Sequence, residues 1–204
     1  MEFTGERPLG NNELFSSRIR YKTILPYVMK KNVLDFGCGV GHGSYFLSRF
    51  CNKVIGYDKS SEAIEEATNN SPRRITLPLK FTNIMPDYTE NIEIVNSCEV
   101  IEHLEKDELE TKLNAFKNLC STFVGTTPNG DVLYYQPKTI EERRGYHLWH
   151  YTYEQLYHLL SRFYRYVEIQ GHAFDPKLNL FTGYTFFATN KIDWTNDWLN
   201  TFFI

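Results

Sequence analysis

Residues 33–43 read Val-Leu-Asp-Phe-Gly-Cys-Gly-Val-Gly-His-Gly, and this segment gives the strongest indication of the fold. A short apolar run leads into the carboxylate of Asp35, and three glycines follow at alternate positions. They are Gly37, Gly39 and Gly41. Because glycine has no Cβ, such a turn reaches unusual φ/ψ values and lets a ligand approach the backbone closely. The pattern therefore predicts a strand, a tight turn and the start of a helix.

A second carboxylate, Asp58, follows the glycine turn. Residues 53–58 read as the next strand, with Asp58 at its carboxyl end, 58 − 35 = 23 residues after Asp35. Doubly wound folds place an acid about 20 residues beyond the glycine turn, where it binds ribose hydroxyls. Alternatively, Asp58 only precedes the next helix, with Ser60 or Ser61 as its N-cap. The glycine turn upstream favours ribose binding.

Composition limits the class of protein. The chain has 204 residues, which fits one domain over residues 1–204, and its formal charge of −3 gives no support for non-specific nucleic-acid binding. The four cysteines form no Cys-x-x-Cys pair, which is typical of a reducing, cytoplasmic compartment. We recognise no signal peptide and no apolar run near the ~18 residues of a membrane span.

Strand and helix signals alternate along the chain. Strands are predicted at residues 32–37, 53–58, 79–84, 92–99, 122–127, 166–171 and 184–190. Helices are predicted at residues 14–29, 41–50, 61–69, 100–104, 107–120 and 152–162, the last with a capping box of Thr152 and Gln155. This order predicts a Rossmann-like α/β fold with seven mostly parallel strands and helices on both faces. The last two strands have no helix between them, so they form an antiparallel hairpin across a loop of about a dozen residues.

The glycine turn also resembles a known family. Asp-x-Gly-x-Gly-x-Gly resembles motif I of class I S-adenosylmethionine (SAM) dependent methyltransferases, and differs from the Gly-x-Gly-x-x-Gly of nicotinamide enzymes. The seven strands with a terminal hairpin resemble that fold over nearly the whole chain. The resemblance implies that Asp35, the three glycines and Asp58 bind SAM.

Two weaker assignments follow from the same resemblance. The family usually has an acid at position 83, where the amide oxygen of Asn83 could still accept a bond from the adenine amino group, with Ile84 as an apolar neighbour; an ordinary strand-end turn is the alternative. Residues 4–7, Thr-Gly-Glu-Arg, resemble the opening of methyltransferases from bacterial polysaccharide gene clusters. Arg7 would then pair with the SAM carboxylate, unless this terminus is unstructured.

Two carboxylates and an imidazole follow the fourth strand, where open α/β sheets bind ligands. Glu99, Glu102 and His103 are spaced i, i+3, i+4, so they share one face if a helix begins at Glu99. Such a set suits Mg²⁺, Mn²⁺ or Fe²⁺. Alternatively, His103 caps or packs the helix and the glutamates are solvated.

Two resemblances meet at this segment. Polysaccharide-cluster methyltransferases carry Ile-Glu-His-Leu, as residues 101–104 do here, and a later histidine. Small-RNA 3′-terminal 2′-O-methyltransferases bind a divalent ion through Glu-x-x-Glu-His and a downstream histidine. That similarity implies Glu99, Glu102, His103 and His147 as ligands of Mg²⁺ or Mn²⁺, while His150 falls where the family has an acid.

The aromatic residues near His147 have two interpretations. They are substrate-side rings, or a packed lid or core. The residues concerned are Tyr134, Tyr135, Tyr146 and Trp149.

Together these observations predict a SAM-dependent O-methyltransferase acting on a sugar or glycan hydroxyl, with His103, Glu102 and His147 as catalytic residues. Two proton routes stay open: His103 as general base, or a bound ion that lowers the pKa of the hydroxyl. Three other functions stay open as well. They are RNA 2′-O-methylation, methylation of a small phenol as in quinone pathways, and an inactive SAM-binding partner subunit.

Overall fold

The computed structural model of the chain describes residues 11–70, 78–132, 147–177 and 179–191. Arg7, Tyr134, Tyr135 and Tyr146 lie outside these ranges, so the roles predicted for them stay predictions.

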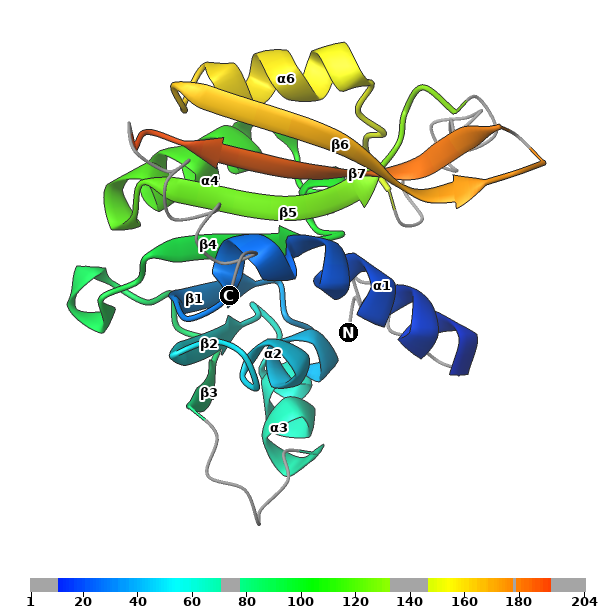
Figure 1. Ribbon diagram of the computed structural model, residues 1–204. Helices are drawn as coiled ribbons and strands as arrows, with labels where there is room; N and C mark the ends of the chain where they lie inside the picture. Colours follow the sequence, from blue (N-terminus) through cyan, green and yellow to red (C-terminus); the bar gives the residue numbers. More distant parts are fainter. Residues whose placement is uncertain (1–10, 71–77, 133–146, 178, 192–204) are drawn as a thin grey trace, which may run out of the picture.

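One mixed sheet organises the described residues (Figure 1). Its strands are β1 (Asn32–Phe36), β2 (Lys53–Tyr57), β3 (Leu79–Thr82), β4 (Ile94–Cys98), β5 (Thr122–Pro128), β6 (Tyr166–Asp175) and β7 (Leu180–Thr189). Their order is β3-β2-β1-β4-β5-β7-β6. The first five strands pair in parallel, whereas β7 pairs antiparallel with both β5 and β6. The predicted fold class is confirmed.

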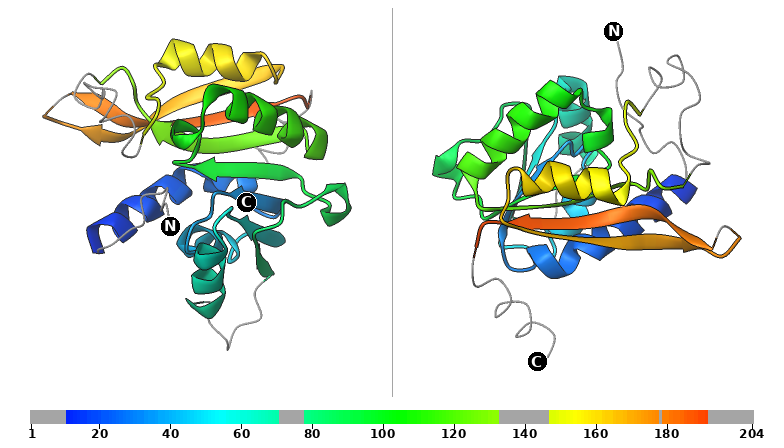
Figure 2. Two further views of the ribbon diagram at one scale, coloured as in Figure 1. Left: turned by 180° about the vertical axis from the view of Figure 1, so that it is seen from behind. Right: turned by 90° about the horizontal axis from the view of Figure 1, so that it is seen from above.

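Helices cover both faces of this sheet (Figure 2). The α-helices are α1 (Asn11–Val28), α2 (His42–Leu47), α3 (Ser61–Asn70), α4 (Lys106–Leu119) and α6 (Tyr153–Ser161); the 3₁₀ turns are η1 (Tyr88–Glu90) and η2 (Ile101–His103). Successive strand residues face opposite sides, so each strand supplies both cores. Val33 joins a core with α1 and α2, whereas Leu34 joins a larger core with α4 and α6.

The helix α6 begins as predicted. The Thr152 hydroxyl accepts a hydrogen bond from the Gln155 backbone N at 3.2 Å, and the Gln155 side chain accepts one from the Thr152 backbone N at 3.1 Å. This capping box fixes where the helix starts.

The terminal hairpin is longer than predicted, and the dozen-residue loop is wrong. Only residues 176–179 separate β6 from β7, and the pair continues past the end of β5 at Pro128 (Figure 1). The error came from treating Gly171 as a strand end. Gly171 lies inside β6. A glycine fits this position because a Cβ there would lie 2.5 Å from the Phe181 ring. Within the strand, Ala173 has a left-handed φ of 55°.

Two further expectations can be compared with the structure. None of the helices within the described residues is long and apolar enough to cross a membrane. All four cysteines are free thiols.

Candidate active site

The glycine turn joins β1 to α2 and takes a left-handed backbone at all three glycines. Gly37, Gly39 and Gly41 have φ values of 75°, 52° and 84°. A Cβ at Gly37 would lie 2.5 Å from Val100, and one at Gly41 would lie 2.6 Å from Phe81. A Cβ at Gly39 would meet no described atom within 4 Å. The outer glycines therefore permit close packing, whereas the middle one faces open space that a ligand can enter.

Asp35 holds this turn from inside the protein. Its carboxylate is fully buried and accepts hydrogen bonds from the Ser44 hydroxyl at 2.5 Å, the Asn96 amide at 2.7 Å and the Tyr21 hydroxyl at 3.2 Å. Burial raises the pKa of Asp35 to about 6, and the three hydrogen bonds oppose that shift. Asp35 thus ties α1, α2 and β4 to the base of the turn.

Asp58 links the turn to the end of β2. One carboxylate oxygen accepts a hydrogen bond from Gly39 N at 2.9 Å, and the other accepts one from Ser60 N at 2.9 Å. Ser60 is also the N-cap of α3, because its hydroxyl accepts a bond from Ala63 N at 3.1 Å. The two interpretations of Asp58 are therefore compatible: it precedes a capped helix, and its carboxylate lies directly beside the open side of Gly39.

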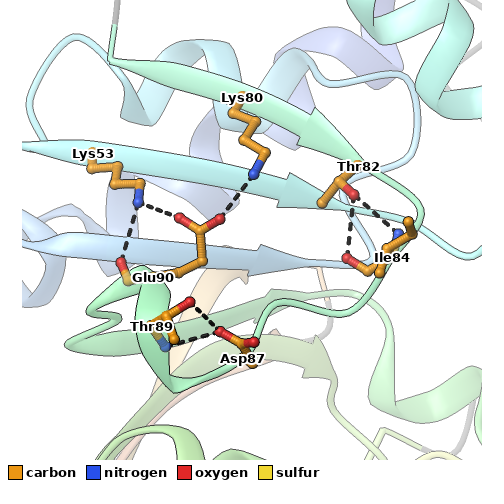
Figure 3. Close-up of polar contacts among 7 residues, drawn as sticks. All are labelled: Lys53, Lys80, Thr82, Ile84, Asp87, Thr89 and Glu90. Carbon is orange, nitrogen blue, oxygen red and sulfur yellow. Dashed lines mark hydrogen bonds and ion pairs between the residues drawn. The ribbon is translucent and has the colours of Figure 1, made fainter.

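Ile84 follows the end of β3, where it forms hydrogen bonds with Thr82 (Figure 3). The Thr82 hydroxyl accepts a bond from Ile84 N at 3.0 Å and donates to Ile84 O at 3.2 Å, which closes the turn around the exposed Asn83. Ile84 is 76% exposed. At the other end of the strand, Glu90 pairs with Lys53 and Lys80 at 2.5 and 2.8 Å. The arrangement leaves Asn83 and Ile84 available to a ligand such as adenine.

Glu99 follows β4, but no helix begins there. It has a left-handed φ of 56°, and its backbone N donates to Thr126 O at 2.9 Å. Its carboxylate accepts a bond from the Thr126 hydroxyl at 2.8 Å and pairs with Arg20 of α1 at 3.3 Å. The condition for one helical face of Glu99, Glu102 and His103, a helix that begins at Glu99, is not met, since the turn η2 begins only at Ile101.

The structure brings together three of the four predicted ion ligands. One ligand atom from each of Glu102, His103 and His147 lies within 4.8 Å of the others. The His103 and His147 rings are 4.8 Å apart between centroids. Glu99 is not part of this group of three, which we call the Glu-His-His cluster. The cluster joins η2 to a segment more than 40 residues later.

Glu102 is the buried member of the Glu-His-His cluster. Its side chain is 0% exposed, and Oε2 accepts a hydrogen bond from the Thr127 hydroxyl at 3.0 Å. The other oxygen, Oε1, is buried with no hydrogen-bond partner among the described residues. Burial raises the pKa of Glu102 well above its usual value, and repulsion from Glu99 adds to the shift. A cation beside Oε1 would offset the cost of burying this carboxylate.

His147 comes from a segment that is bound to Glu102 through the main chain. The Glu102 carbonyl accepts bonds from Leu148 N at 2.8 Å and Trp149 N at 3.2 Å. Burial lowers the pKa of His147 to about 3, and charge repulsion from His103 is the next cause. A neutral imidazole is the form that binds a metal ion. Trp149 packs against the larger core, with Lys106 Nζ 4.5 Å from the ring centroid, which favours its packing role.

The two parts of the site share one edge of the sheet. Because β1 and β4 are parallel neighbours, the glycine turn and the Glu99–His103 segment both follow carboxyl ends. Val100 even fills the space beside Gly37. A cofactor in front of Gly39 and an ion in the Glu-His-His cluster are both consistent with the residues present, on the grounds of the open space and the buried carboxylate oxygen.

Several supporting residues could not be identified from the sequence. Tyr21, Ser44 and Asn96 hold Asp35, and Arg20 and Thr126 hold Glu99. The only local signal is polarity inside otherwise apolar β4 and β5. Nothing near Arg20 or Tyr21 in the sequence marks them.

The fold is Rossmann-like, and solved methyltransferases share it. Residues 33–122 match the profile of a family described as "Methyltransferase domain". A "probable S-adenosylmethionine-dependent methyltransferase" of Mycobacterium tuberculosis strain H37Rv is 26% identical over 110 residues, which are 51% of this chain and 39% of that protein. The chain thus matches about two fifths of the length of that curated relative.

Solved structures show the same fold. The methyltransferase domain of a bacterial Hen1 protein, CtHen1, has a TM-score of 0.62 and 21% identity, and the match covers 86% of this chain and 99% of that one. The small RNA methyltransferase HEN1 has a TM-score of 0.64 and 18% identity, covering 94% of this chain and 27% of that one. Magnesium protoporphyrin IX methyltransferase from Synechocystis, with bound SAM, has a TM-score of 0.60 and 14% identity, covering 93% and 87%. These structures share the fold of this chain, and the matched family profile and curated relative are described as methyltransferases.

Proposed function

We propose that this chain is a SAM-dependent O-methyltransferase that methylates a hydroxyl of a sugar or glycan, assisted by Mg²⁺ or Mn²⁺. One observation carries the proposal: the Glu-His-His cluster lies at the same sheet edge as the glycine turn. A hydroxyl acceptor needs help to lose its proton, because its pKa is far above 7. A divalent ion held by carboxylate and imidazole ligands supplies that help.

The residues divide into a cofactor half and an acceptor half. In the cofactor half, the glycine turn and Asp58 bind the methionine and ribose parts of SAM, and Asn83 and Ile84 flank its adenine. SAM supplies an electrophilic methyl group on its sulfonium. Asp35 does not reach the ligand directly in this account. It fixes the turn through its three buried hydrogen bonds.

In the acceptor half, Glu102, His103 and His147 would hold the ion. When bound, the ion would lower the pKa of a hydroxyl beside it, so that the hydroxyl proton is released to solvent as the oxygen takes the methyl group. Glu99 stays with Arg20 and Thr126 and shapes the backbone from which Glu102 projects. A vicinal diol suits such a site, because both of its oxygens can reach the ion. The site must hold one oxygen in line with the methyl group at near-attack distance.

The second candidate acceptor is the 3′-terminal ribose of an RNA. The similarity of the Glu-His-His cluster to the ligand set of small-RNA methyltransferases and the fold similarity to HEN1 favour it. The formal charge of −3 favours a sugar, since RNA binding relies on a basic surface.

Transfer of a labelled methyl group from SAM tests the proposal. The panel contains glycans with vicinal diols, a short RNA with a free 3′ end, and a catechol. We expect label in a glycan, loss of transfer with EDTA and recovery with Mn²⁺. Preferential labelling of RNA, with the steep salt dependence of phosphate contacts, would establish the second candidate instead. Label in the catechol alone would point to phenol methylation. Tight binding of S-adenosylhomocysteine without transfer to any acceptor would indicate an inactive subunit.

A further inference from the structure

His150 contacts His147 of the Glu-His-His cluster but is not one of the three residues of the cluster. Its Nε2 lies 2.6 Å from Nδ1 of His147, and the two rings are 4.9 Å apart between centroids. We propose that His150 is a positioning residue, which accepts a hydrogen bond from His147 Nδ1 and thereby turns His147 Nε2 toward the ion. The inference rests on the proposed function, because it concerns the ion that this function requires.

The short distance restricts the tautomers of the pair. Two neutral imidazole nitrogens at 2.6 Å need one proton between them, so one ring donates and the other accepts. If His147 binds an ion through Nε2, that nitrogen carries no proton and Nδ1 must carry it. Nδ1–H then donates to His150 Nε2. Metal-binding histidines generally donate their second N–H to a carboxylate, a backbone carbonyl or water, which fixes the ring and raises its basicity. In this chain, His150 Nε2 takes the place of that acceptor.

The backbone around His150 is fixed by contacts with two other segments of the chain. A Cβ at Gly130 would lie 2.4 Å from the His150 carbonyl oxygen and 2.6 Å from its carbon, so the two main chains are in direct contact. Gly130 N also donates to Tyr151 O at 2.8 Å. On the other side, the Glu102 carbonyl binds Leu148 N and Trp149 N. The segment is thus fixed to the turn after β5, at Gly130, and to η2, so the ring of His150 has a defined place from which to orient His147.

Binding of Mn²⁺ to the intact chain tests the inference. Electron paramagnetic resonance of free Mn²⁺ gives the affinity, with S-adenosylhomocysteine present. His150→Ala should weaken Mn²⁺ binding by about 10- to 100-fold, the usual effect of removing a partner of a metal-binding histidine. His150→Gln should recover a large part of it, because the glutamine amide oxygen can accept the same bond. Exposed His158 on α6 provides the matched control, and His158→Ala should leave the affinity unchanged.

The outcomes separate this inference from the function on which it rests. Glu102→Gln removes a ligand charge and should abolish Mn²⁺ binding while S-adenosylhomocysteine still binds. If Glu102→Gln does so but His150→Ala binds Mn²⁺ like the wild type, the role of His150 is refuted and the ion site stands. Failure of His150→Gln to recover any affinity would also refute it. If the wild type binds no Mn²⁺, the ion and the role of His150 both fall, and methyl transfer alone then tests the enzyme.

Discussion

Among alanine substitutions of the three turn glycines, we expect Gly39→Ala to weaken cofactor binding with the smallest loss of folding stability. The new methyl group meets no described atom within 4 Å, so it adds no clash inside the protein. Its folding cost is the strain of a φ of 52°, about 1–2 kcal/mol for a residue with a Cβ. The methyl group enters the open space that we assign to SAM. We therefore expect S-adenosylhomocysteine to bind at least about tenfold more weakly, which corresponds to about 1.4 kcal/mol.

Gly41→Ala is the contrasting variant at the next glycine. Its Cβ would lie 2.6 Å from Phe81 Cζ and 2.9 Å from Ala67 Cβ, which adds overpacking of about 1–3 kcal/mol to the strain. In urea unfolding, Gly41→Ala should be clearly less stable than Gly39→Ala. In calorimetry, the folded Gly39→Ala protein should bind S-adenosylhomocysteine more weakly than the wild type. A folded Gly39→Ala protein that binds S-adenosylhomocysteine as tightly as the wild type would refute the assigned position of the cofactor.

Three further outcomes follow from the same geometry. Asp58→Ala should lower the affinity for S-adenosylhomocysteine by about 1–3 kcal/mol in calorimetry, whereas Asp87→Ala on the exposed η1 turn should not; equal affinities would remove Asp58 from the site. Because the pKa of Asp35 is raised to about 6, its stabilising contribution is present below about pH 4 and is lost as the pH rises through 6. The unfolding free energy of the wild type minus that of Asp35→Asn should fall by roughly 3 kcal/mol over that interval, and a flat difference would contradict the shift. Thr152→Ala should cost about 1 kcal/mol in thermal or urea unfolding by removing the cap of α6, and an unchanged stability would show that the capping box adds nothing.

Local sequence signals were enough for the fold because its determinants are local. A short apolar run marked β1, the glycines marked the turn after it, and the alternation of strand and helix signals marked the fold class. Thr152 and Gln155 marked the start of α6. The predicted end of the strand at Gly171 was wrong, because the need for glycine there comes from the neighbouring strand. Phe181 occupies the space that a Cβ at Gly171 would fill.

The candidate site was only partly predictable, because it depends on residues far apart in the chain. Glu102, His103 and His147 were identified from residue type and resemblance, and the structure places them together. Glu99 was grouped with them by spacing, but spacing does not show a left-handed backbone. Arg20 comes from a helix 79 residues earlier (99 − 20), and it fixes the Glu99 side chain through an ion pair that no local pattern indicates.

We expect the cofactor and the ion to meet at one acceptor oxygen. A crystal structure of the chain with S-adenosylhomocysteine and Mn²⁺, with the ion located by its anomalous scattering, tests this most directly. We predict the ion between Glu102, His103 and His147, and the sulfur in front of Gly39, close enough for one oxygen atom to lie between them. An ion bound only to surface carboxylates, or a sulfur directed away from the Glu-His-His cluster, would contradict the account.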